Sequence, residues 1–162
     1  MSEAARSGTR VILVTLVIAL LLTILPMPEW AERFRPQWVA MTLIYWALAL
    51  PTRVGVFWAW GVGLVMDVTS GTVLGQHALS LSVAVYLAVE LHARIRVFPL
   101  LQQAVSVWVL LLVERLLALW VFGATGQPTP TLWYWMPTFT GMLLWPWIFI
   151  LLRDVRRRFA VA

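Results

Sequence analysis

Six long apolar runs, separated by arginines, prolines and turn residues, constrain this chain more than any other feature of its sequence. A helix needs about 20 residues to cross the ~30 Å hydrocarbon core of a bilayer. Because 62% of the 162 residues are hydrophobic and 12% are charged, a soluble fold of this size could not bury so much apolar surface. We expect one polytopic, all-α integral membrane domain over residues 1–162, with six transmembrane helices over residues 11–25, 38–50, 54–66, 78–91, 100–122 and 133–152.

The runs over 38–50 and 54–66 are short for full crossings. Only Pro51 to Arg53 interrupt them, so they could instead form one re-entrant hairpin. The distribution of arginines favours six crossings with both termini in the cytoplasm, because basic residues accumulate on the cytoplasmic side. That arrangement places two arginines outside, Arg33 and Arg35, and nine inside: Arg6, Arg10, Arg53, Arg94, Arg96, Arg153, Arg156, Arg157 and Arg158.

Few residue types capable of chemistry are present. There is no Cys, which excludes disulfides and thiolate sites. The two histidines, His77 and His92, belong to opposite ends of one apolar run and cannot share a metal. No nucleophile–base motif or phosphate-binding loop occurs. We therefore expect no enzyme activity, cofactor or metal. The basic residues sit between apolar runs and form no contiguous stripe, so we also expect no nucleic-acid partner.

Small residues recur at four-residue spacing in the third run, at Gly55, Ala59 and Gly63, and Asp67 continues the same helix face. Small residues at this interval let a second helix approach closely. The stripe is therefore a candidate helix-packing or partner interface that ends in a polar pocket. The simpler interpretation is that Asp67 is hydrogen-bonded within its own turn.

Glu114 and Arg115 lie inside the fifth run. Each charged side chain costs roughly 2.5–3.5 kcal/mol at the bilayer centre. Neighbouring helical residues point about 100° apart, so the two do not pair ideally with each other. One interpretation is an intramembrane contact with other helices or with a partner protein. The alternative is an internal ion pair, or an Arg115 side chain that extends to the membrane surface.

Basic residues cluster at two predicted inner helix ends: Arg94 and Arg96 follow the fourth run, and Arg153, Arg156, Arg157 and Arg158 follow the sixth. Such clusters fix topology or bind anionic lipid, at about 1 kcal/mol per residue near the surface. The simpler interpretation is a solvated membrane edge.

Several segments taken together resemble the MreD family, the rod-shape-determining membrane proteins of bacteria. The resemblance follows the chain in order through Arg35-Pro36-Gln37-Trp38, Tyr45 to Val54, Gly63 with Asp67, Ser70-Gly71, Leu74-Gly75, Leu144 to Phe149 and Arg153 to Val161. It implies a non-enzymatic inner-membrane component of the elongation machinery, which supports peptidoglycan synthesis and cell shape. The implied partners are an MreC-like bitopic protein and, indirectly, the MreB filament, RodA and the elongation transpeptidase.

The same resemblance implies a compact six-helix bundle, similar to the substrate-binding subunits of energy-coupling-factor vitamin transporters. The alternative function is therefore a small-molecule-binding subunit of a vitamin-type transporter. A vitamin site needs several convergent polar contacts, and few polar residues are expected at a common depth here. The sequence thus favours the protein-binding role.

Overall fold

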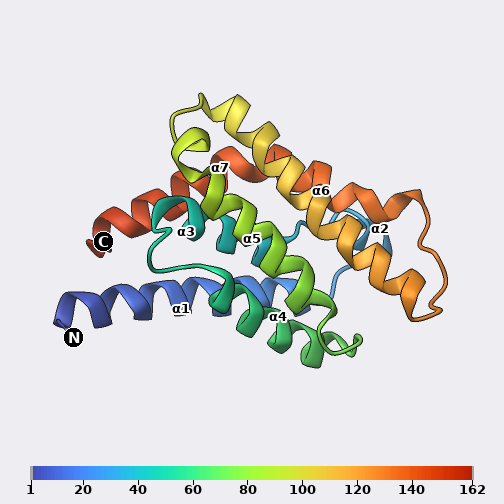
Figure 1. The fold of residues 1–162 in the computed structure, drawn as a ribbon. Coiled ribbons are helices and arrows are strands. Elements are labelled where there is room, and N and C mark those ends of the chain that lie inside the picture. The colour runs from blue at the N-terminus through green and yellow to red at the C-terminus, as the bar shows by residue number, and fades with distance from the viewer. Residues whose placement is uncertain (1, 162) are drawn as a thin grey trace.

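The structure is a computed structural model that describes residues 2–161. Within that range its regular secondary structure is entirely helical, without strands (Figure 1). The elements are α1 (Glu3–Ile24), α2 (Glu29–Glu32), α3 (Trp38–Ala49), α4 (Val56–Ser70), α5 (Gln76–Ile95), α6 (Leu100–Ala124), the 3-10 helix η1 (Leu132–Trp135) and α7 (Met136–Arg158).

Four of these helical segments are long and apolar enough to cross a membrane: α1, α5, α6 and the continuous stretch of η1 and α7. The helices α3 and α4 are also apolar, but they have 12 and 15 residues. At a rise of about 1.5 Å per residue they extend over roughly 18 and 22 Å. Each of the six predicted runs overlaps one of these helices.

Apart from α3, each predicted helix extends beyond one or both ends of the apolar run that predicts it. α1 begins at Glu3, where the Ser2 hydroxyl oxygen accepts a hydrogen bond from the Ala5 amide at 3.3 Å. α7 continues to Arg158, past the end of its apolar run. Hydropathy marks where a helix can contact lipid, whereas caps and turns decide where the backbone leaves the helix. The one-turn helix α2 has no apolar periodicity and was not predicted.

Helix α3 forms the centre of the bundle. Every residue from Val39 to Leu48 is buried, and α1, α5, α6 and α7 all contact this helix. A helix that is apolar on all sides is stable only when it is surrounded. Within this core the Trp46 indole Nε1 donates a hydrogen bond to the Thr15 hydroxyl at 2.9 Å, which fixes α3 against α1.

Both described ends of the chain lie at one end of the bundle, together with the α3–α4 and α5–α6 connections (Figure 1). We call this the termini end. Here Arg53, between α3 and α4, donates from Nη2 to the Ala5 carbonyl at 2.7 Å and to the Thr9 hydroxyl at 2.9 Å. A Cβ added to Gly8 would lie 3.2 Å from Val161. The start of α1 and the segment that follows α7 therefore meet near Arg53.

The α1–α3, α4–α5 and α6–α7 connections lie at the other end of the bundle, here called the loop end (Figure 1). Arg35 donates to the carbonyl of Thr23 and, at 2.6 Å, to that of Leu25, which satisfies free acceptors at the end of α1. Arg33 stacks over the Trp133 ring at 5.1 Å. These contacts fasten the α2 segment to both α1 and η1.

Candidate functional site

The loop end contains a polar cavity of about 190 Å³. It lies among the ends of five helices and the 3-10 helix. We call it the polar cavity. Its polar lining consists of Thr23, Gln37, Ser70, Thr72, Gln76, His77, Glu114, Arg115 and Tyr134.

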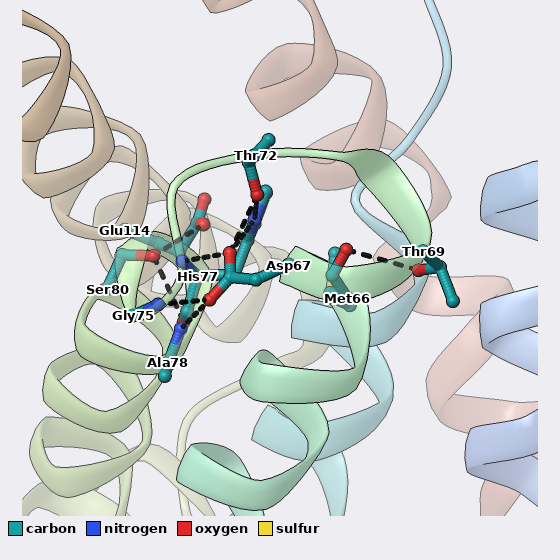
Figure 2. Close-up of polar contacts among 9 residues, drawn as sticks. All are labelled: Met66, Asp67, Thr69, Thr72, Gly75, His77, Ala78, Ser80 and Glu114. Atoms are coloured by element: carbon teal, nitrogen blue, oxygen red, sulfur yellow. Dashed lines mark hydrogen bonds and ion pairs between the residues drawn. The ribbon is translucent and has the colours of Figure 1, made fainter.

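Asp67 organises one wall of the cavity (Figure 2). Its carboxylate accepts hydrogen bonds from the Thr72 hydroxyl at 2.8 Å, from the backbone amides of Gly75 and His77 at 2.8 and 2.9 Å, and from the Ala78 amide at 3.4 Å. The His77 ring Nδ1 lies 2.8 Å from the same carboxylate. Because a carboxylate only accepts, we place a proton on this nitrogen.

The turn between α4 and α5 is shaped to surround this carboxylate. Gly71 and Gly75, at its two ends, have φ values of 67° and 101°, a region that residues with a Cβ rarely enter. The chain thereby reverses within a few residues and directs its amides at Asp67. The carboxylate is 1% exposed. Asp67 is thus hydrogen-bonded within its own turn, as the simpler interpretation of the sequence predicts.

Glu114, unlike Asp67, lines the cavity directly. Its side chain is 4% exposed, accepts a hydrogen bond from the Ser80 hydroxyl at 3.0 Å, and accepts another from the Gln37 amide nitrogen (Figure 2 shows the Ser80 contact). Among the described residues no cationic side chain lies within ion-pairing distance of Glu114. The internal Glu114–Arg115 ion pair considered from the sequence is therefore not formed.

Arg115 is oriented by an aromatic residue instead. Its guanidinium lies 4.7 Å from the centre of the Tyr134 ring, and the Tyr134 hydroxyl donates to the Arg115 backbone carbonyl at 2.7 Å. These contacts hold the side chain toward η1 and the cavity. Its Nε is buried without a hydrogen-bond partner in the described part of the chain.

Two further cavity residues carry unpaired atoms: the side-chain oxygens of Gln37 and Gln76 are buried without a partner among residues 2–161. Sequence reasoning did not connect Gln37, Gln76 or Ser80 with Glu114. The available signal was weak, because each is a neutral polar residue near the start of an apolar run, where a helix boundary is expected. Only the fold shows that the starts of α3 and α5 meet beside Glu114.

The stripe of small residues packs inside the molecule. Ala59, Gly63 and Asp67 are buried, and a Cβ added to Gly63 would lie 2.5 Å from the Ala78 backbone nitrogen of α5. Gly55 precedes α4 and has open space around it. The close approach thus joins α4 to α5, and the partner-contact role of the stripe stays a prediction.

At the termini end, Arg96, Arg153 and Arg156 converge on a second cavity of about 190 Å³, which Tyr45 and Gln103 also line. Arg94, Arg157 and Arg158 are exposed. The two predicted basic clusters therefore share one end of the bundle. Their lipid-binding role stays a prediction.

Comparison with known proteins agrees with the resemblance seen in the sequence. Residues 5–155 match the family described as rod shape-determining protein MreD. The chain is also similar to the rod shape-determining protein MreD of Haemophilus influenzae, with 33% identity over 145 residues that cover 88% of each chain. No solved structure matches the chain. The match includes all of α2 to α6 and every residue that lines the polar cavity, so this chain belongs to the MreD family of rod shape-determining proteins.

Proposed function

We propose that this chain is a non-catalytic, multi-pass component of the rod-shape complex in the bacterial cytoplasmic membrane. In this role it binds the single transmembrane helix of an MreC-like partner and thereby supports peptidoglycan synthesis and cell shape. Family membership carries the rod-shape role. An open groove between α1 and α4 supports the docking step.

Six crossings are supported by the position of Arg53. A re-entrant hairpin would leave this arginine at mid-depth in the bundle. Arg53 instead bonds to Ala5 and Thr9 near the start of α1, whereas Arg35, before α3, bonds near the end of α1. The segment between the two arginines therefore runs from one end of the bundle to the other, despite the shortness of α3.

Cytoplasmic termini are supported by the side chains at the two ends. The basic clusters lie at the termini end, as the preference for basic residues on the cytoplasmic side requires. At the loop end Trp30, Trp120 and Trp133 are exposed. Exposed tryptophans prefer the headgroup level of a bilayer, which fits a membrane boundary at this end.

The proposed docking site is an open apolar groove of about 530 Å³ between α1 and α4. We call it the α1/α4 groove. The residues that line it are Leu13, Leu16, Val17, Leu20, Phe57, Trp58, Gly61, Val62 and Val65. Lipid tails are as apolar as another helix, so helix association in membranes depends on close packing. The shape of the groove, rather than its apolarity, is therefore the relevant property.

Gly61 supplies that shape. It is exposed in the middle of α4, and a Cβ added there would meet nothing within 4 Å. A glycine on an exposed helix face lets a partner backbone approach closely. Gly63, two residues later and on the buried face, already packs against the backbone of α5. The helix thus has one glycine for internal packing and one facing outward.

The transporter alternative is less well supported by the cavities. Sites for small molecules of vitamin size have volumes of roughly 300–1,000 Å³, whereas the polar cavity has about 190 Å³. The α1/α4 groove is large enough, at about 530 Å³, but its lining is apolar and does not offer the convergent polar contacts that such a site needs.

The test compares two matched substitutions, Gly61→Leu in the groove and Gly123→Leu in α6, where a Cβ also meets open space. Tagged proteins are extracted from native membranes in mild detergent, and co-purifying proteins are identified by mass spectrometry. We expect the natural protein and Gly123→Leu to recover a bitopic coiled-coil partner, and Gly61→Leu to lose most of it. Equal recovery with all three would disprove docking in the groove. Recovery of paired ATPases with a transmembrane coupling subunit would favour the transporter alternative.

A further inference from the structure

Glu114 has no cationic partner among residues 2–161. Its side chain is 4% exposed and, within the same residues, accepts hydrogen bonds from the neutral groups of Ser80 and Gln37. Buried charges in proteins are normally paired, because an isolated buried carboxylate is very costly. A cation from outside the chain can supply the missing partner.

The surrounding atoms favour an external cation. The Gln37 amide nitrogen donates to Glu114, so the Gln37 oxygen remains free to accept a hydrogen bond. The Gln76 oxygen, on a side chain that is 3% exposed, is also unpaired. Together with Glu114 these are three acceptors lining one cavity. A primary ammonium group has three N–H donors and no acceptor, which matches this set.

A cationic donor adjoins the acceptors. Arg115 follows Glu114 in the helix, lines the same cavity and leaves its Nε buried and unpaired. Its stacking on Tyr134 restricts the side chain to this side of the bundle. Guanidinium groups recognise phosphate especially well. The cavity therefore presents an ammonium-binding region beside a phosphate-binding group.

We propose that the polar cavity binds a phosphoethanolamine group. The ammonium of this group bonds to Glu114, Gln37 and Gln76, and its phosphate pairs with Arg115. The inference goes beyond the proposed scaffold role and does not depend on the α1/α4 groove, which lies on different residues.

Size limits what can enter. A volume of about 190 Å³ admits a headgroup but leaves no room for acyl chains. The aromatic rings of Trp38 and Phe122 also line the cavity and provide apolar contact for the glycerol region of a lipid. The same chemistry can come from phosphatidylethanolamine at the membrane boundary or from a soluble phosphoethanolamine compound, and these sources are distinguished experimentally.

The test uses the purified full-length protein, stripped of lipid and examined by native mass spectrometry. Three probes are added in turn: phosphatidylethanolamine, phosphatidylcholine and phosphatidylglycerol. Phosphatidylcholine keeps the positive charge but has no N–H donors, and phosphatidylglycerol has no cation. We expect phosphatidylethanolamine to bind about tenfold more tightly than either other lipid, or better. The reason is that a single hydrogen bond to a charged group changes an affinity by about this factor.

Two matched variants locate the site. Glu114→Gln removes the charge and keeps a similar shape, and should lower phosphatidylethanolamine binding about tenfold. Glu90→Gln makes the same change elsewhere, on α5 near the termini end, and should bind normally. Thermal unfolding of each variant without lipid checks that the fold is retained. A third variant, Gln76→Leu, removes one neutral acceptor and should weaken phosphatidylethanolamine binding while leaving the charge in place.

Soluble glycerophosphoethanolamine distinguishes the sources. If it displaces phosphatidylethanolamine at matched concentration, the headgroup alone suffices and a soluble ligand is the source. If it does not, the site requires a lipid. Equal binding of phosphatidylethanolamine and phosphatidylglycerol would overturn the proposal. Unchanged binding in Glu114→Gln would also overturn it.

Discussion

Asp67 has a structural role that can be separated from ligand binding. It accepts bonds from Thr72, Gly75 and His77 and thereby closes the turn between α4 and α5. In Asp67→Asn one oxygen becomes an N–H donor that faces other donors. Each buried group left unpaired costs about 1–3 kcal/mol. We expect the thermal midpoint of the purified protein to fall by roughly 2–4 °C for every kcal/mol lost.

Asp154→Asn is the matched control. Asp154 is exposed, and its Oδ1 lies 3.9 Å from the Arg153 Nε, which makes a weak surface ion pair. Surface pairs of this kind contribute little, so its midpoint should stay near that of the natural protein. Equal midpoints for both variants would show that the Asp67 network does not stabilise the turn.

At the residue scale the sequence predicts the two buried carboxylates at the loop end, but not the neutral residues that contact Glu114. Glu114 and Asp67 are conspicuous because a carboxylate inside or beside an apolar run is costly. Ser80 and Gln37 are 34 and 77 positions from Glu114 along the chain. No periodicity relates such distant positions, and only the packing of α3, α5 and α6 brings them together.

At the scale of a single element, α4 offers a test of internal packing against open surface. Gly63→Ala places a methyl group 2.5 Å from the Ala78 nitrogen, in backbone that cannot move without separating α4 from α5. Overpacking of this kind typically costs 1–3 kcal/mol. Gly61→Ala, two residues earlier, enters open space and should gain up to about 1 kcal/mol of helix propensity.

The two glycine variants are compared by thermal unfolding in the same detergent. We expect a lower midpoint for Gly63→Ala and an unchanged or higher midpoint for Gly61→Ala. If Gly61→Ala is the more destabilised of the two, the assignment of the buried and exposed faces of α4 is wrong.

The sequence predicts that α3 is a helix but not that it lies at the centre. Its apolar run resembles the others, because a membrane allows apolar side chains to face lipid as readily as protein. The contrast appears only in the structure, where Val39 to Leu48 are all buried while α1 leaves Val14, Val17 and Leu21 more than half exposed. Hydropathy alone cannot distinguish these two environments.

At the scale of the whole molecule, the absence of Cys from the sequence allows topology to be tested with single introduced cysteines. Thr129→Cys lies in the α6–α7 connection, whereas Val97→Cys, at a position 78% exposed, lies in the α5–α6 connection. With cytoplasmic termini, a membrane-impermeant maleimide should label Thr129→Cys in spheroplasts and Val97→Cys only after lysis.

Thr52→Cys, exposed between α3 and α4, addresses the number of crossings. Six crossings place it on the same side as Val97→Cys, so it too should react only after lysis. Labelling of Thr52→Cys in spheroplasts would place the α3–α4 connection outside and would contradict the six-crossing arrangement. Labelling of Val97→Cys before lysis would show that the termini end faces outward, the opposite of the proposed orientation.

The two arginines that flank α3 also set a dimension. Arg35 bonds to Thr23 and Leu25, and Arg53 bonds to Ala5 and Thr9. These contacts are 14 to 20 residues apart along α1, or about 21–30 Å, whereas α3 between the two arginines has 12 residues. Because α3 is buried from Val39 to Leu48, its neighbours rather than α3 itself face the surroundings. A short central helix of this kind imposes no hydrophobic mismatch on a bilayer, since mismatch arises only where a helix meets lipid.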